Sequence, residues 1–323
     1  MSLMKLEPDY WIELEQGYKA SLAARHKLLE THGDMALFSS PGDSTALACH
    51  ELLEMALQFV CHRYPACFAI EGDGADRVLV NHILQTRTPL RKEDALDGLK
   101  SLQILFDNIP EDFAIVQRDD TDGRYRLRAA AVCSSVGWHI GQHRGKPLRD
   151  IHGSVTDYAT KMARSMDRYF ARMPTDQPIQ RGSWSLEQGR PLFLPEEGMR
   201  EDVPDIDVED ITLRCDWQTL RRLPLTGAIV FNFKAVFTAF TKLRTEPYVP
   251  ALLHCVLSEG DPRLITPGKC MKNTRAVVLP TLKEWEDEQT KAGVVPTDWE
   301  PRTLDESPFF PGWEAQWHEA QGF

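Results

Sequence analysis

Apolar residues recur at helical spacing in a long stretch near the start of the chain. The segment STALACHELLEMALQFVCHRY, residues 44–64, contains neither Gly nor Pro and runs from a Ser/Thr cap to Pro65. Its apolar positions, three and four residues apart, are Leu52, Leu53, Ala56, Leu57 and Val60. We therefore predict that residues 1–105 form a mainly helical N-terminal region that packs on the core.

Further along the chain the pattern changes from a helical to an extended period. The segments DFAIVQRD and YRLRAAAVCSS flank the turn-forming DTDG, an arrangement typical of a β-hairpin. A second pair of segments, DITLRCDWQTL and GAIVFNFKAVF, is joined by RRLPLTG. The two pairs predict antiparallel strands.

A helix is predicted between the two hairpins, in TDYATKMARSMDRYFARM at residues 156–173, with Thr156 or Asp157 as its N-cap. Its apolar face carries Met162, Met166, Tyr169, Phe170 and Met173. Its basic face carries Lys161, Arg164, Arg168 and Arg172. Hairpins with helices between them predict an α+β core with an antiparallel sheet over residues 106–280.

The last part of the chain, residues 281–323, is rich in Trp, Pro and acidic residues. Its four tryptophans are Trp285, Trp299, Trp313 and Trp317. Because aromatic side chains of this size favour burial, we predict a C-terminal tail that wraps on the body of the protein.

The charge balance narrows the range of partners. The 37 basic and 48 acidic side chains give a net charge of −11, which disfavours general affinity for nucleic acid or for an anionic membrane. No apolar run approaches the ~20 residues that span a bilayer. The first residues, MSLMKLEPDYWIELEQ, lack the apolar centre of a signal peptide, so we expect a cytoplasmic protein.

The spacing of the cysteine and histidine residues gives little support for a metal site built from several side chains. The seven cysteines form no CxxC pair, which disfavours zinc ribbons, iron–sulfur sites and disulfide frameworks. The pairs Cys49–His50 and Cys61–His62 lie about 16 Å apart on the predicted helix, too far to share one ion. His139 and His143 are four residues apart, but the glycines around them favour a loop over a zinc-binding helix.

His152 stands in a different setting, within DIHGSVTDYATKM between the strand-rich stretch and the predicted helix. One imidazole without neighbouring ligands cannot build a zinc site, but it can serve as the axial ligand of a haem, whose porphyrin supplies the other four nitrogens. The alternative from the same residues is a histidine that caps the helix or fills the core. The spacing alone leaves both readings open.

The strands of the second pair alternate between apolar and polar positions. Leu213, Cys215 and Trp217 point one way, and Arg214, Asp216 and Gln218 point the other. On the next strand, Phe231 and Phe233 alternate with Asn232 and Lys234. The polar positions either face solvent or line one side of a binding pocket.

An ordered set of motifs resembles the haem-dependent oxidative N-demethylase family. The motifs are IHGSVTDY, RGSWSL and LRCDWQTLRRLPLTGAIVFNFK, and the likeness extends to YWIELEQGYKASLAARHKLL and ELLEMALQFVCHRYP nearer the start. It covers about residues 5–245. The family pattern reads Ile-His-Gly-Pro-Val-Pro, then Arg-x-Asn-Trp, then Leu-Arg-x-Glu-Arg-Gln-Thr-Leu-x-Arg-Leu-Pro and an apolar strand ending in Ile-Arg.

The resemblance implies an antiparallel sheet of PAS-like type that binds haem b, with His152 as the iron ligand. It implies cofactor-binding roles for Arg181, Trp184 and Arg222, and it implies that Arg214 or Arg222 pairs with the haem propionates. Asp216 would hold a substrate amine or relay protons, with Arg214 and Lys234 beside it at the catalytic centre.

The implied activity is that of a haem-dependent monooxygenase or oxidative demethylase, in which dioxygen oxidises a small organic substrate, such as an amine or a secondary metabolite. Oxidation of a methylamine would release formaldehyde. Electrons would come from NAD(P)H through a separate flavin or iron–sulfur partner, because the chain has neither a nucleotide-binding GxGxxG in a strand-to-helix context nor a cluster-binding cysteine set. The basic helix face could dock an acidic electron donor, or it could simply face solvent.

Several departures from the family pattern leave the substrate open. Asp216-Trp217 replaces Glu-Arg, and Lys234 replaces the late Arg. Ser154 and Thr156 replace both prolines of the histidine loop, and Ser183 replaces Asn. Two other readings remain: a haem-binding or ligand-binding sensor without turnover, which would need an output domain for which we expect no room here, and a metal-free interaction protein.

Overall fold

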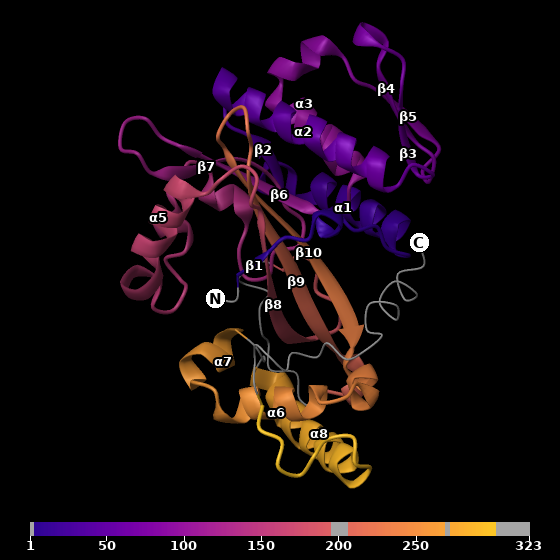
Figure 1. Cartoon of the computed structure of the whole chain (residues 1–323), viewed down its shortest axis with the longest axis vertical. Coiled ribbons are helices and arrows are strands. Elements are labelled where there is room, and N and C mark those ends of the chain that lie inside the picture. The colour runs from indigo at the N-terminus through magenta and orange to yellow at the C-terminus, as the bar shows by residue number, and fades with distance from the viewer. Residues whose placement is uncertain (1–2, 195–205, 269–271, 302–323) are drawn as a thin grey trace.

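The computed structural model describes residues 3–194, 206–268 and 272–301, and it has a mixed α+β architecture built on one large antiparallel sheet (Figure 1). Its seven strands lie in the order β1-β8-β9-β10-β6-β7-β2. Their bounds, in that order, are Met4–Lys5, Ile179–Gln188, Ile211–Arg222, Ile229–Ala239, Asp112–Arg118, Tyr125–Ala131 and Leu37–Ser39. The two predicted hairpins are confirmed as β6–β7 and β9–β10.

One face of this sheet is covered by the helices α1 (Tyr18–His32), α2 (Asp43–Arg63) and α3 (Gly98–Asn108). Leu52, Ala56 and Leu57 of α2 are fully buried there, as the helical spacing predicts. The N-terminal region also contains strands that periodicity did not indicate. It supplies both edge strands of the large sheet and a separate three-stranded sheet of β3 (Phe68–Glu71), β4 (Val78–Asn81) and β5 (Thr86–Pro89).

The opposite face of the sheet is covered by the segment that contains His152. This segment forms the short helix α4 (Leu148–Ile151), a π-helical turn η6 (Tyr158–Met162) and α5 (Ala163–Arg172). Phe170 and Met173 pack there against Leu220, Ile229 and Phe233 of the sheet. The predicted helix therefore begins with a π-helical turn. Asp157, the residue just before this turn, has a left-handed backbone conformation.

Three helices pack where β8 ends and β9 begins: α6 (Val249–Glu259), α7 (Pro262–Gly268) and α8 (Lys272–Lys291) (Figure 1). Trp285 of α8 is buried against Phe240, with 4.8 Å between ring centroids, and Trp299 contacts Tyr248. The first part of the predicted tail thus packs on the body as a helix. Residues 302–323, including Trp313 and Trp317, lie outside the described residues.

The remaining short helices connect these elements. Their bounds are η1 Pro8–Tyr10, η2 Gly33–Met35, η3 Gly74–Asp76, η4 Lys92–Leu96, η5 Ile140–His143, η8 Val208–Asp210 and η9 Phe240–Thr245. Among the helices of the described part of the chain, none combines the length and the apolar character that a bilayer crossing requires.

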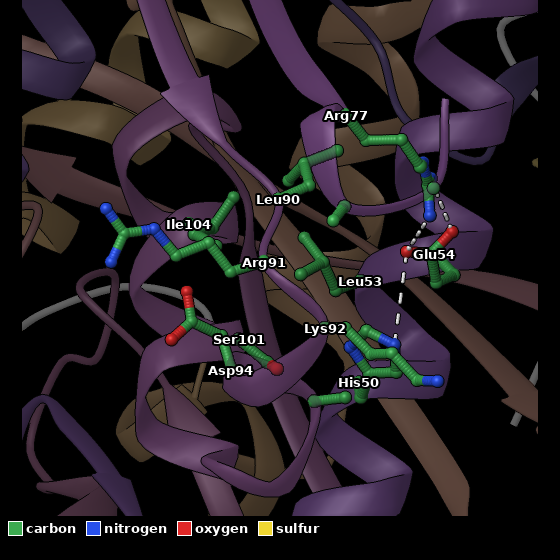
Figure 2. Close-up of a pocket in the computed structure, with 13 residues that line it drawn as sticks. His50, Leu53, Glu54, Arg77, Leu90, Arg91, Lys92, Asp94, Ser101 and Ile104 are labelled. Atoms are coloured by element: carbon green, nitrogen blue, oxygen red, sulfur yellow. Dashed lines mark hydrogen bonds and ion pairs between the residues drawn. The ribbon is translucent and has the colours of Figure 1, made fainter. Parts of the chain in front are cut away.

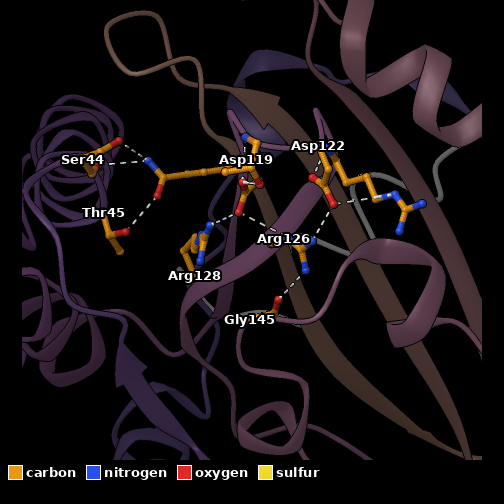
Figure 3. A network of polar contacts seen from close by, with 10 residues as sticks. Ser44, Thr45, Asp119, Asp122, Arg126, Arg128 and Gly145 are labelled. Atoms are coloured by element: carbon orange, nitrogen blue, oxygen red, sulfur yellow. Dashed lines mark hydrogen bonds and ion pairs between the residues drawn. The ribbon is translucent and has the colours of Figure 1, made fainter.

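The β6–β7 hairpin is braced at its turn and also anchors the segment that leads to α4. Arg126 donates to Asp122 at 2.6 Å, and Arg128 donates to Asp119 at 2.7 Å (Figure 3). On the other side, Arg126 Nη1 donates to the Gly145 carbonyl at 3.3 Å, and the Gly145 amide donates to the Leu127 carbonyl at 2.8 Å. The strand β7 therefore fixes the backbone immediately before α4.

Candidate functional site

The ring of His152 is held in one orientation at the C-terminal end of α4. Its Nδ1 lies 2.8 Å from the Leu148 carbonyl oxygen, which can only accept, so Nδ1 carries the proton and donates. The ring also stacks on Tyr158, with centroids 4.8 Å apart and planes inclined by 9°. Within the described residues no hydrogen-bond partner reaches Nε2, and its lone pair is therefore available to a ligand.

Burial keeps this imidazole neutral. Desolvation lowers the pKa of His152, the positive charge of Arg181 lowers it further, and the hydrogen bond to Leu148 opposes the shift. A neutral ring with Nδ1–H bonded to a carbonyl is the form in which histidine ligates iron or zinc through Nε2. The local structure therefore leaves His152 in the form that a metal ligand would need.

Basic and aromatic side chains surround this position on the same face of the sheet. Arg181 on β8 is half-buried, and burial lowers its pKa. The pKa of His143 is also lowered, mainly by burial and then by the positive charge of Lys146. Trp138 lies 6.2 Å from His143 and 6.4 Å from Phe233 between ring centroids. The surroundings combine apolar rings with positive charge.

The strand register decides which predicted residues share the face of His152. Arg181 pairs with Gln218, Ser183 with Asp216, and Ser185 with Arg214 across β8 and β9. On the other side, Phe233 pairs with Gln218, and Ala235 with Asp216. Since directly paired residues point to the same face, Arg181, Arg214 and Asp216 lie on the face of Phe233.

One expectation about these faces is wrong. The polar positions of β9 and β10 do not line a common side, because Lys234 pairs with Trp217 and points to the opposite face. Its Nζ donates to the Glu13 carbonyl at 2.7 Å and lies 3.5 Å from a Glu15 carboxylate oxygen. The geometry separates Lys234 from Asp216.

Asp216 is held in place by Arg214. Nε and Nη2 of Arg214 each lie 3.0 Å from Oδ1 of Asp216. The same guanidinium donates to the Pro191 carbonyl at 2.7 Å and to the Ser134 carbonyl at 2.6 Å. Because Arg214 is buried and these contacts use its donors, it is a positioning group for Asp216, whose side chain remains 24% exposed.

A buried carboxylate, Asp112, stabilises the backbone that Arg214 contacts. Asp112 accepts from the amides of Cys133 and Ser134, at 2.8 and 2.7 Å, and also from the Ser134 hydroxyl. It forms an ion pair with Arg25, and both side chains are almost fully buried. The carbonyl of Ser134 that receives Arg214 is therefore fixed by Asp112.

Two other predicted residues are engaged elsewhere. Arg222 donates to the carbonyls of Met173 and Gly227, at 2.6 and 2.7 Å, and to the Phe170 carbonyl, so it binds the C-terminal end of α5 to the sheet. Trp184 pairs with Cys215 on the opposite face from Arg181 and packs against the cluster of the C-terminal helices. These contacts give both residues a role in packing.

The fold and the site define a mixed α+β protein that presents one anchored, neutral imidazole beside a basic and aromatic sheet face. A family model described as haem-dependent oxidative N-demethylase, alpha subunit-like, matches residues 2–279 of the 323-residue chain. The chain belongs to this family, and the resemblance found in its motifs is confirmed.

The residues present fit the haem that the family name implies. No three His, Cys, Asp or Glu side chains gather as metal donors in the described ranges, whereas a haem needs only one protein ligand. His152 would supply that ligand through Nε2, and Arg181 would supply a cation for a propionate. The sequence did not predict that Tyr158 stacks on His152 or that the Leu148 carbonyl bonds it, because neither contact can be recognised from a sequence motif.

A separate buried group, Glu111, lies beside Lys234 and predicts a pH dependence of stability. Burial raises the pKa of Glu111 from 4.5 to about 7, opposed by Lys234 and by hydrogen bonds from Asn232 and the Glu13 amide. The raised folded-state pKa contributes stability that is fully present below pH 4.5 and is lost as the pH rises through about 7.

Glu111→Gln, which imitates the protonated acid, is expected to remove this dependence. Urea unfolding at pH 5, 6, 7 and 8 should show the wild type losing up to about 3 kcal/mol relative to the variant across that range. Parallel stability curves for the two proteins would show that Glu111 keeps an ordinary pKa.

Proposed function

We propose that this chain is a haem-binding oxidoreductase that uses dioxygen to oxidise a small organic substrate, most simply the N-methyl group of an amine. The observation that carries the proposal is the anchored, neutral His152, with its Nε2 available, in a chain of the haem-dependent oxidative N-demethylase alpha subunit-like family. We include in the proposal that the antiparallel sheet is of PAS-like type and that the protein acts in the cytoplasm.

Each residue of the site has a proposed task. His152 would hold the iron of haem b through Nε2, and the Leu148 carbonyl would keep the ring oriented and basic. Arg181 would pair with a propionate. When bound, the haem would supply the redox chemistry with dioxygen that no side chain provides.

Asp216 is the proposed contact for the substrate. An ammonium substrate would be held by its carboxylate, which could also accept a proton from the amine. Arg214 fixes the carboxylate and compensates part of its charge. The substrate would then lie on the sheet face that also carries Phe231 and Phe233, whose rings are 5.1 Å apart.

Electrons would come from NAD(P)H through a separate reductase or ferredoxin-type partner. The basic face formed by Lys161 of η6 and by Arg164, Arg168 and Arg172 of α5 is exposed, and it is our candidate for docking an acidic donor. Neutralising these four residues together should raise the KM for the donor and weaken its salt dependence, while leaving the KM for the amine unchanged.

The activity is tested by aerobic turnover of the haem-loaded protein with NADPH, a surrogate reductase and N-methylated amines, with formaldehyde as the measured product. Asp216→Asn is expected to lower kcat by about 10²–10⁴-fold, the usual contribution of a positioned acid or base, with an unchanged haem spectrum. Asp216→Glu, which restores the carboxylate of the family pattern, should recover much of the rate.

The two outcomes that oppose the proposal are distinct. A full haem complement without formaldehyde or any other oxygenated product would favour a haem-binding sensor module. Equal rates for Asp216→Asn and the wild type would remove Asp216 from the chemistry and leave the haem assignment intact.

A further inference from the structure

A cavity of about 450 Å³ lies in the N-terminal region, between α2, α3, η4 and the β3–β4 turn (Figure 2). His152 is not among the residues that line it. Its apolar lining comes mainly from Leu53, Leu90 and Ile104, which are all buried. Its ionisable lining comes from six residues: His50, Glu54, Arg77, Arg91, Lys92 and Asp94. A volume of this size accommodates a small organic molecule.

Ser101 brings an unpartnered polar group to this cavity. Its side chain is 1% exposed, and its hydroxyl oxygen is buried without a hydrogen-bond partner among the described residues. A buried hydroxyl without a partner is destabilising, because it has lost the hydrogen bonds that water would supply. Ser101 lines the cavity, and we expect a bound ligand to satisfy the hydroxyl when the side chain rotates toward it.

The charges around the cavity are only partly balanced by one another. Arg77 forms a two-pronged ion pair with Glu54, at 3.1 and 2.9 Å, and His50 lies 4.0 Å from the same carboxylate. Arg91, Lys92 and Asp94 have no ion pair within the described part of the chain. Two cations therefore face one carboxylate, in a protein whose overall charge is strongly negative.

We propose that this cavity is a binding site for a small organic carboxylate with an apolar body. The carboxylate group would pair with Lys92 or Arg91, the Ser101 hydroxyl would donate a hydrogen bond to the ligand, and Leu53, Leu90 and Ile104 would cover its hydrocarbon part. Figure 2 shows Arg91 and Lys92 extending to opposite sides of the cavity, so either end can receive the charge. The proposal is independent of the haem site.

The test is isothermal titration of the full-length protein with three probes of equal length: hexanoate, hexylammonium and 1-hexanol. Hexanoate is expected to bind saturably with a Kd of about 1 mM or below, and at least tenfold more tightly than the other two. Lys92→Ala combined with Arg91→Ala should weaken hexanoate binding by about tenfold or more. Lys100→Ala removes an exposed cation of α3 outside the lining and should change nothing.

Ser101→Ala separates a ligand contact from a packing role. Because the hydroxyl lacks a partner, the variant should melt at the wild-type temperature or above it, and yet bind hexanoate several-fold more weakly. Three results would overturn the proposal: no saturable binding of hexanoate, a preference for hexylammonium, or an equal loss of affinity in Lys100→Ala and in the double variant.

Discussion

His152→Ala is expected to yield a folded protein that no longer takes up haem with the spectrum of a histidine ligand. Of the two ring nitrogens, Nε2 is the one that can ligate a metal, because Nδ1 is already bonded to the Leu148 carbonyl. Loss of the ligand itself should weaken haem binding by more than the ~10–100-fold that removal of an orienting partner costs. Haem titration followed at the Soret band measures the effect.

His143→Ala is the matched control, because His143 is the other imidazole near the site and its Nδ1 is buried without a partner among the described residues. It should retain haem with the wild-type spectrum. His152→Gly with imidazole added to the buffer should regain the Soret band, since the free base can enter the space of the lost ring. The assignment fails if His143→Ala loses the haem and His152→Ala keeps it.

Helices and hairpins could be predicted from the sequence wherever the pattern is local. The long helix predicted at residues 44–64 is found as Asp43–Arg63, and the strands flanking DTDG are β6 and β7. In both cases the apolar face recurs within one segment, so no distant contact is needed to define it. The strands β1 and β2 have only two and three residues and form by pairing with distant strands. They are too short to show an alternation of apolar and polar positions in the sequence.

The candidate site was harder to predict, because alternation fixes faces within a strand but not between strands. A shift of one residue in register exchanges the two faces of a strand, and this shift decides whether Lys234 joins Asp216 or opposes it. The family motif assigned both Arg181 and Trp184 to cofactor binding, but a spacing of three residues places them on opposite faces of the strand. The role of His152 as a ligand stays a prediction.

The supports of the site come from residues that no motif contains. Asp112 and Ser134 lie at the ends of the first hairpin, at positions that the sequence presents as ordinary strand ends. Their importance follows from burial. The Asp112 carboxylate is 1% exposed and needs hydrogen-bond donors, and it finds them in the backbone amides next to the carbonyl that Arg214 contacts. Tertiary contact, and not local pattern, makes this part of the site.

Asp112→Asn is accordingly expected to destabilise the protein by about 3–5 kcal/mol, because it leaves the charge of Arg25 buried without its partner. Urea unfolding at neutral pH measures the loss. The control is Glu71→Gln, which breaks a 2.6 Å ion pair with Arg87 of the same chemistry on the surface. Solvent screens that pair, so its removal should change the stability only slightly.

If Asp112→Asn does not accumulate as folded protein, Arg25→Lys still tests the idea. Lysine keeps the charge but lacks the planar fork with which Arg25 contacts Asp112 through Nη1 and the Glu111 carbonyl through Nη2, so we expect it to lose one of the two contacts. A loss of about 1–3 kcal/mol is expected from the unsatisfied acceptor. The buried pair would have no special weight if Arg25→Lys and Glu71→Gln lowered the free energy of unfolding equally. In that case the backbone at Ser134, and with it Asp216, would have to be held by contacts other than Asp112.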